Sequence, residues 1–268
     1  MRRLASLIGL SALALVPAHA SATSEPPLSS SSPDDSGDFV LSITYEGGFV
    51  PLEWAFVNTP ALMITDDGRL VLQGAIPEIY PGPLLPALVQ HTISEEGVDA
   101  YLELVEEYGL LEHRQYEGND MVADAASTVV RIRIDGEEYV HSAYALGLDE
   151  ETDPDRSALQ EFVGHALDPA TLVGDDALGE EEPFATDFFL VMAYESDPSM
   201  EAETEPAPEV VDWPAAASVR LADADVCAEV PYGEVADVLD AATQLTWFED
   251  DGVTYRVAAT PQVPGRSC

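Results

Sequence analysis

Short runs of alternating apolar and polar residues recur along the chain, and several of them are interrupted by an Asp-Gly pair. In the clearest run, Val130, Ile132 and Ile134 alternate with two arginines and lead into Asp135-Gly136. Because successive side chains of a β-strand point to opposite faces, this pattern predicts a strand with one face on a core. Glycine readily adopts the positive φ of a tight turn, so Asp-Gly between two such runs predicts a hairpin. We expect three hairpins, formed by 61–65 with 69–73, 128–134 with 137–143, and 246–249 with 253–259.

Apolar residues at intervals of three and four predict three helices between these hairpins. Ser94 and Asp153 are placed to cap the first two, because a short polar side chain accepts a hydrogen bond from the free N–H groups of the first turn. Two acids follow Ser94 and Pro154 follows Asp153, as is typical of a first helical turn. The third helix is expected at about 232–243.

These elements predict the fold class. Each expected helix has a single apolar side, and each hairpin pairs its strands in opposite directions. We therefore expect an α+β fold with a largely antiparallel sheet of Asp-Gly hairpins and three helices packed on one face. Further strands are expected at 39–45, 184–195 and 218–226.

The domain organisation follows from the same pattern. We expect a single α+β domain over 39–268, because the C-terminal half alone holds few apolar residues for a core. Two acid-rich loops interrupt the pattern and leave a second arrangement open, in which subdomains 39–168 and 184–268 are joined by these loops.

The first residues are typical of an export signal. Two arginines precede an apolar run over 4–16, which is too short to span a bilayer, and Ala18-His19-Ala20 fits a cleavage site. A second match ends at Ala22, so cleavage after either alanine is expected and 1–22 is taken as the signal peptide. No Cys follows either site, so we expect no lipid anchor. The Ser- and Pro-rich segment 23–38 is expected to be a disordered linker to the folded domain.

The composition is strongly acidic. The chain has 10 Lys and Arg against 51 Asp and Glu; two of the ten lie in the export signal, so the secreted form keeps 8 and has a net charge of −43. Such a surface repels phosphate backbones and anionic lipids, which argues against nucleic acid and membrane surfaces as partners. The protein is expected not to be membrane-embedded, because the apolar run in the export signal is too short to span a bilayer. Basic proteins, cations or an envelope component remain as partners. A surface adapted to solubility or salt is the alternative explanation.

Two cysteines, Cys227 and Cys268, predict one disulfide in an exported chain. Closing a loop of 41 residues stabilises a fold by about 4 kcal/mol in the chain-entropy model. A two-Cys metal site needs His partners nearby, and a catalytic thiol leaves the other Cys idle, so we expect no metal and no cofactor.

One loop gathers side chains that can perform acid–base chemistry or grip a polar ligand, and a hairpin follows it. The candidate residues are His113, Tyr116, Asp124 and Ser127, together with His141 in the second strand of that hairpin. The alternative is that the acid and the hydroxyl only satisfy the backbone of the turn. No nucleophile elbow, phosphate-binding loop or calcium loop is present in the sequence, so we assign no catalytic residue.

Aromatic residues accompany a proline-rich segment near the N-terminal end of the expected domain. Exposed aromatic rings beside rigid Pro segments are common in protein and carbohydrate contact surfaces. The alternative is that the rings cover the core beneath a long loop. The residues concerned are Trp54, Phe56 and Tyr80, with Pro77, Pro81, Pro83 and Pro86.

The order of parts over 39–168 resembles uncharacterised secreted and lipoprotein families of bacteria. The resemblance rests on a strand ending in Gly-Gly, a Ser-capped helix with an acidic first turn, the stretch Asp124-Ala125-Ala126-Ser127-Thr128, two Asp-Gly hairpins, and a helix opening at Arg156 with Leu159. Such families carry no assigned activity, so the resemblance implies export and a fold, and it transfers no catalytic residue.

Three functions are compatible with these features. The first is a secreted, non-catalytic domain that binds another macromolecule or an envelope component. The second is a hydrolase of unrecognised type that uses the loop 113–128, with His141 as base. The third is an inhibitor or sink for basic proteins or cations, on the basis of charge alone.

Overall fold

The computed structural model describes residues 38–118, 122–148, 150–196 and 206–268. These residues belong to one compact unit, Asp34–Cys268. The expected export signal, 1–22, and all of the expected linker except Asp38 lie outside the described residues.

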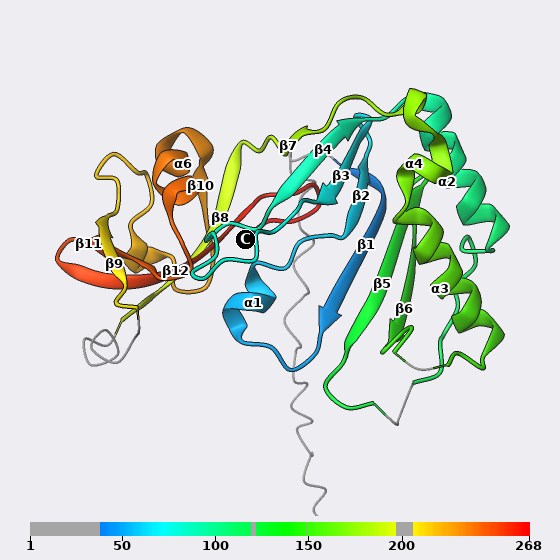
Figure 1. Cartoon of the computed structure of the whole chain (residues 1–268), viewed down its shortest axis with the longest axis horizontal. Helices are drawn as coiled ribbons and strands as arrows, with labels where there is room; N and C mark the ends of the chain where they lie inside the picture. The colour runs from blue at the N-terminus through cyan, green and yellow to red at the C-terminus, as the bar shows by residue number, and fades with distance from the viewer. Residues whose placement is uncertain (1–37, 119–121, 149, 197–205) are drawn as a thin grey trace, which may run out of the picture. The chain divides into compact units, whose positions relative to one another are not determined.

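The first sheet has seven strands in the order β6-β5-β1-β2-β3-β4-β7, and every neighbouring pair is antiparallel. Most of its strands follow one another along the chain, so neighbours in sequence are neighbours in the sheet (Figure 1). The strands are β1 (Phe39–Gly47), β2 (Leu62–Thr65), β3 (Arg69–Gln73), β4 (Leu88–Thr92), β5 (Ala126–Ile134), β6 (Glu137–Tyr144) and β7 (Glu182–Pro183).

The second sheet has five strands in the order β10-β8-β12-β11-β9. Its pairs are antiparallel except β9 with β11, which run parallel. The strands are β8 (Phe188–Glu195), β9 (Glu209–Asp212), β10 (Ala228–Pro231), β11 (Thr246–Asp250) and β12 (Val253–Pro261).

Three strand pairs surround the Asp-Gly sequences, namely β2 with β3, β5 with β6, and β11 with β12. In the last two, Asp135-Gly136 and Asp251-Gly252 are two-residue turns in which both residues have positive φ, between 51° and 79°. This is the backbone of a type I′ turn, whose twist matches that of the flanking strands.

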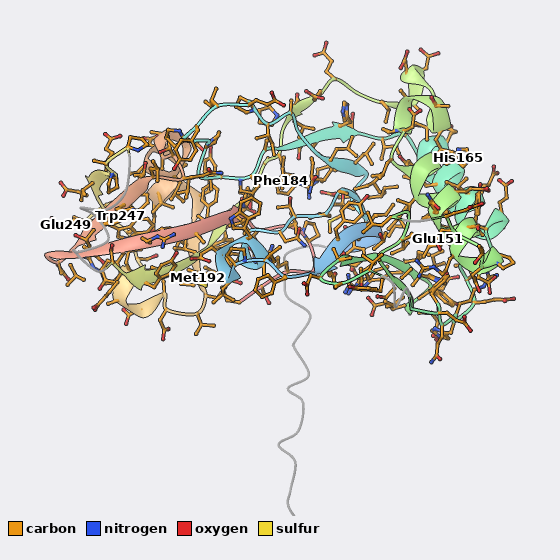
Figure 2. The ribbon with its side chains drawn as sticks, turned by 60° about the horizontal axis from the view of Figure 1, so that its bottom comes forward. Glu151, His165, Phe184, Met192, Trp247 and Glu249 are labelled. Carbon is orange, nitrogen blue, oxygen red and sulfur yellow. A yellow bond between two sulfur atoms is a disulfide. The ribbon has the colours of Figure 1, made fainter. Side chains whose placement is uncertain are left out.

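The helices divide between the two sheets. Helices α2 (Glu95–Glu107) and α3 (Pro154–Ala166) bury one apolar side each against the seven-stranded sheet, and two apolar residues of the short α4 (Pro169–Val173) pack against the same core. The 3₁₀ turn η1 (Asp175–Ala177) follows α4. Helix α6 (Tyr232–Ala241) packs on the five-stranded sheet, and the 3₁₀ turn η2 (Leu221–Asp223) joins the same core. Figure 2 places His165 on α3, and Met192 and Trp247 on strands of the second sheet.

The caps form as local chemistry requires. The Ser94 hydroxyl accepts a hydrogen bond from the Gly97 N–H, and the Asp153 carboxylate accepts from two N–H groups in the first turn of α3. The Tyr101 hydroxyl donates to the carbonyl of Ala166 at 3.0 Å, which ties α2 to the end of α3 inside the core.

The structure corrects the expectation of one sheet with three helices on one face. The first core takes its buried residues from 41–166, whereas α6 belongs to a separate core formed by residues 189–259. Strand pattern alone does not specify which strands share a sheet, because sheet order is set by pairings between distant residues.

The expected strand at 218–226 is also wrong. Leu221 and Ala224 are both buried and lie three residues apart, which matches the period of the 3₁₀ turn η2 that occupies this region. The strand begins later, as β10. The second of the two acid-rich loops was expected at 196–211; its last residues form the start of β9, and 197–205 lie outside the described residues.

Candidate functional site

The structure brings two of the candidate loop residues together. The Tyr116 hydroxyl lies 2.8 Å from Nδ1 of His141, and Nε2 of His141 lies 2.8 Å from the carbonyl oxygen of Leu110. A carbonyl only accepts, so Nε2 carries the proton and Nδ1 accepts from the tyrosine. His141 is fully buried, and this burial lowers the pKa of its imidazole. Burial likewise raises the pKa of Tyr116 to about 12, so both groups are neutral at pH 7.

The other candidates are placed differently. The ring of His113 packs against Tyr139 with centroids 5.4 Å apart. Asp124 adopts a positive φ of 59°, and its carbonyl oxygen accepts from the Phe49 N–H. Ser127 lies in β5. Among the described residues, no hydrogen bond joins these three side chains to His141. The part of the loop at 119–121 lies outside the described residues.

A buried ion pair joins the start of α3 to the candidate loop and to the end of β6. The side chains of Arg156 and Glu151 are 5% and 8% exposed, and they are joined at 2.6 Å. The Arg156 guanidinium also donates to the carbonyls of Glu117 and Tyr144, so its donors are matched by acceptors. Hydrogen bonds from Arg156 lower the pKa of Glu151, which keeps the carboxylate charged. This cluster holds the loops together and presents no free polar group to a ligand.

A different region has the features of a binding site. A cavity of about 440 Å³ lies between helix α1 (Leu52–Phe56), the segment 76–87, and strands of the second sheet. Trp54 and Ile76 form its rim and are 66% and 70% exposed. Trp247, Leu84 and Val257 line it further in. Cavities of this size with mostly apolar walls are the usual form of ligand sites.

The proline-rich segment 76–87 forms one wall of the cavity, and backbone hydrogen bonds join it to the loop before β11 of the second sheet. The Gln244 N–H donates to Gly82 at 2.9 Å, and the Leu84 N–H donates to Ala242 at 3.0 Å. Leu84 and Leu85 pack against the second core. Tyr80 precedes these anchors in the sequence and is 70% exposed, although it does not line the cavity. The exposed rings of Trp54 and Tyr80 fit the contact-surface interpretation of the sequence better than the core-cover alternative.

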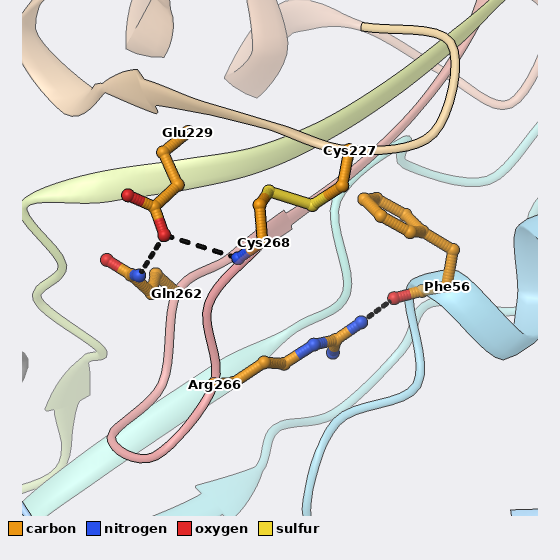
Figure 3. Close-up of a disulfide and its surroundings, with 6 residues drawn as sticks. All are labelled: Phe56, Cys227, Glu229, Gln262, Arg266 and Cys268. Atoms are coloured by element: carbon orange, nitrogen blue, oxygen red, sulfur yellow. Dashed lines mark hydrogen bonds between the residues drawn. A yellow bond between two sulfur atoms is a disulfide. The ribbon is translucent and has the colours of Figure 1, made fainter. Parts of the chain in front are cut away.

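The opposite wall, α1, is held by three contacts from the C-terminal half of the chain. The Tyr194 hydroxyl donates to the carboxylate of Glu53. The Arg266 guanidinium donates to the carbonyl of Phe56, at the end of α1 (Figure 3). It also donates to the carbonyl of Asn58 at 2.6 Å. Phe56, in turn, is half-buried beneath this guanidinium.

The predicted disulfide lies next to this anchor. Cys227 and Cys268 are joined, with their Cα atoms 5.5 Å apart. The Cys268 N–H and the Gln262 side chain both donate to the carboxylate of Glu229, so the C-terminal segment is fastened to β10 on both sides of Arg266 (Figure 3). The disulfide therefore secures the segment that positions α1.

Five polar side chains line the cavity, namely Glu53, Tyr194, Gln244, Thr246 and Arg256, and two of them retain unused hydrogen-bonding groups. The guanidinium of Arg256 lies over the ring of Tyr194, with Nη2 3.8 Å from a carboxylate oxygen of Glu53. With the described residues, neither this guanidinium nor the side-chain amide of Gln244 forms a hydrogen bond. The hydrogen bond from Tyr194 lowers the pKa of Glu53, so the Glu53–Arg256 pair is charged and close to neutral overall.

The polar groups that line the cavity can donate and accept hydrogen bonds. No Ser, Cys or His occurs among the described residues that line the cavity, so it holds no pairing of a nucleophile with an imidazole base. Among the described residues of the chain, no group of three or more His, Cys, Asp or Glu is arranged to hold a metal ion. The cavity is an apolar hollow whose polar groups are a guanidinium, a carboxylate, an amide and two hydroxyls.

The sequence indicated only one side of this site. Trp54 and three of the prolines, which the sequence predicted as part of a contact surface, line the cavity. Tyr194, Gln244 and Arg256 lie more than a hundred residues further on, and no local signal links them to the N-terminal wall.

Comparison with protein-family models, with curated proteins and with solved structures finds no match for this chain. The resemblance drawn from residues 39–168 stays a prediction.

Proposed function

We propose that this chain is an exported, non-catalytic binding domain, and that the cavity between α1 and the proline-rich segment is its binding site. The observation that carries the proposal is an apolar cavity of about 440 Å³ whose rim residues, Trp54 and Ile76, remain largely exposed. Large apolar side chains at the mouth of a hollow are unfavourable in water unless a partner covers them.

Export is part of the same proposal. The N-terminal pattern of arginines, apolar run and small residues supports it, and so does the disulfide, because disulfides persist outside the reducing cytoplasm. None of the helices in the described residues has the length and hydrophobicity to cross a membrane. The partner is a macromolecule or an envelope component; the acidic surface disfavours nucleic acid.

The cavity can be tested with Nile red, an uncharged dye that fluoresces in apolar surroundings. The secreted form should bind the dye with a single saturable site. Trp54→Ala and Ile76→Ser should each weaken dye binding roughly fivefold, because each removes apolar surface worth about 1 kcal/mol. Leu148→Ser is the matched control, since Leu148 is also 65% exposed and does not line the cavity.

Two outcomes would contradict the proposal. If the dye does not bind, or if the control weakens binding as much as the rim variants, the cavity is not a specific site. The export step is checked separately by mass spectrometry of protein from the culture medium, which should have lost its first 20 or 22 residues.

A further inference from the structure

We infer that the cavity receives an apolar segment of a basic polypeptide, whose backbone is recognised by Glu53, Gln244 and Arg256. This inference rests on the proposed binding function and specifies the class of its ligand. Three features of the surface support it, namely the extent of the apolar area, the kind of polar groups within it, and the charge around it.

The exposed apolar surface extends beyond the cavity. Trp54 lines the cavity and also a second hollow of about 340 Å³, which it shares with Val50 and Tyr45 on the other side of α1. Phe49, just before α1, is 88% exposed. A small molecule seated in the cavity leaves the second hollow uncovered. An extended polypeptide with apolar side chains can fill both hollows and cover Trp54 between them.

The polar groups suit an amide better than a charged group. Arg256 provides donors, Glu53 provides an acceptor, and the Gln244 side chain provides both. Since Glu53 and Arg256 lie 3.8 Å apart, their charges largely cancel, and an isolated carboxylate or ammonium gains little net attraction there. A peptide unit carries one donor and one acceptor close together, which matches this arrangement.

The charge outside the cavity selects among polypeptides. Glu78, two residues after Ile76 in the sequence, and Glu249, on the same strand face as Trp247, are both exposed. Arg256 is the basic residue among the described residues that line the cavity, and it is already paired with Glu53. With 51 acidic residues in the chain, the field repels acidic partners and attracts basic ones. Lysines or arginines flanking the apolar segment therefore complement the rim.

Three labelled twelve-residue peptides test this inference by fluorescence anisotropy. Two share the same apolar centre of leucine and phenylalanine and differ in their flanks, which are lysines in one and glutamates in the other. The third keeps the lysines and has serines at the centre. At low salt the basic apolar peptide should bind at least about tenfold more tightly than either of the others, and its advantage over the acidic peptide should shrink in about 0.5 M sodium chloride.

Variants assign the binding to the cavity. Trp54→Ala and Arg256→Gln should each weaken binding of the basic apolar peptide about fivefold or more. Arg69→Gln is the matched control for the arginine, because Arg69 also pairs with an acid and lies near an aromatic ring, but does not line the cavity. Leu148→Ser is the control for the tryptophan. Equal losses in the controls would overturn the inference.

Other results separate this inference from the function on which it rests. If Nile red binds and the three peptides do not differ, the cavity is a binding site but its ligand is not a basic polypeptide. Equal binding of the serine-centred peptide would mean that charge alone acts. Stronger displacement of Nile red by dodecanoate than by dodecylamine would show that Arg256 recognises a carboxylate. If neither dye nor peptide binds, the proposed function itself is wrong.

Discussion

Polar side chains are used differently in two regions of the folded unit. Beneath the helices of the seven-stranded sheet, both ring nitrogens of His141 have partners, and Arg156 donates to Glu151 and to two backbone carbonyls. In the cavity beside α1, Arg256 and Gln244 form no side-chain hydrogen bond with the described residues. In the first region the polar side chains find their hydrogen-bond partners within the protein. In the second region polar groups remain available for a ligand.

This difference shows why residue type alone is a poor guide to function. His141 is the kind of residue that sequence reasoning favours for chemistry, yet its surroundings use all of its hydrogen-bonding capacity. Buried polar groups with matched partners stabilise and specify a fold. Polar groups that line a hollow and lack partners are the ones that a ligand can satisfy. The following predictions test this contrast, from the largest expected effect to the smallest.

The disulfide should affect both stability and binding. Replacing Cys227 and Cys268 together by Ser should lower the free energy of unfolding by about 4 kcal/mol, because the unfolded chain regains the freedom of a closed 41-residue loop. The same change should weaken Nile red binding, since the disulfide secures the segment from which Arg266 holds α1. Urea unfolding and dye titration measure the two effects. Unchanged dye affinity in the folded variant would show that α1 does not depend on this anchor.

Breaking the buried ion pair should affect stability alone. Arg156→Ala leaves the Glu151 carboxylate buried without its partner, which should cost about 3 kcal/mol in urea unfolding. Dye binding by the fraction that remains folded should be unchanged, because this pair does not line the cavity. If the variant folds normally but no longer binds the dye, the ion pair and the cavity are coupled, and the ion pair is not purely structural.

His141 should make stability depend on pH. Burial holds the folded pKa of His141 below 6.5, so the unfolded chain takes up a proton that the folded chain does not. Stability should therefore fall as the pH drops below about 6.5, by up to about 1.4 kcal/mol per pH unit until the folded pKa is reached. His141→Gln should flatten this slope in urea unfolding at a series of pH values between 7 and 5. An identical slope in the variant would exclude His141 as its source.

Arg256 should contribute little to stability. Its ion pair with Glu53 is long and partly exposed, and such pairs are worth less than about 1 kcal/mol. Arg256→Gln should shift the urea midpoint no more than the control Arg69→Gln, while only the former weakens binding of the basic apolar peptide. A large loss of stability in Arg256→Gln would show that Arg256, like Arg156, mainly stabilises the fold.

Local sequence signals predicted the elements whose chemistry is local. Ser94 and Asp153 cap helices as expected, because capping involves only the first turn. The sequence also contained enough information to predict the burial of His141. A two-residue turn at Asp135-Gly136 pairs His141 with Val130, so an inward-facing Val130 places His141 on the same buried face.

The rest depends on contacts that no local pattern records. Two sheets formed where one was expected, because β8–β12 pair with one another in a sheet of their own. Helix α6 packs on this second sheet and not on the first. The polar half of the cavity was missed for the same reason. Tyr194 and Arg256 lie on β8 and β12 of the second sheet and Glu53 lies on α1, so their contact joins elements far apart in the sequence.

The bond from Arg266 to the end of α1 also has a consequence for the order of folding. It joins residues 210 positions apart, whereas the first core takes its buried residues from 41–166. Contacts between distant parts of a chain form late, because a long loop must close before they contribute. We expect the helix-covered sheet to assemble early, and the cavity to take shape only when the last residues arrive.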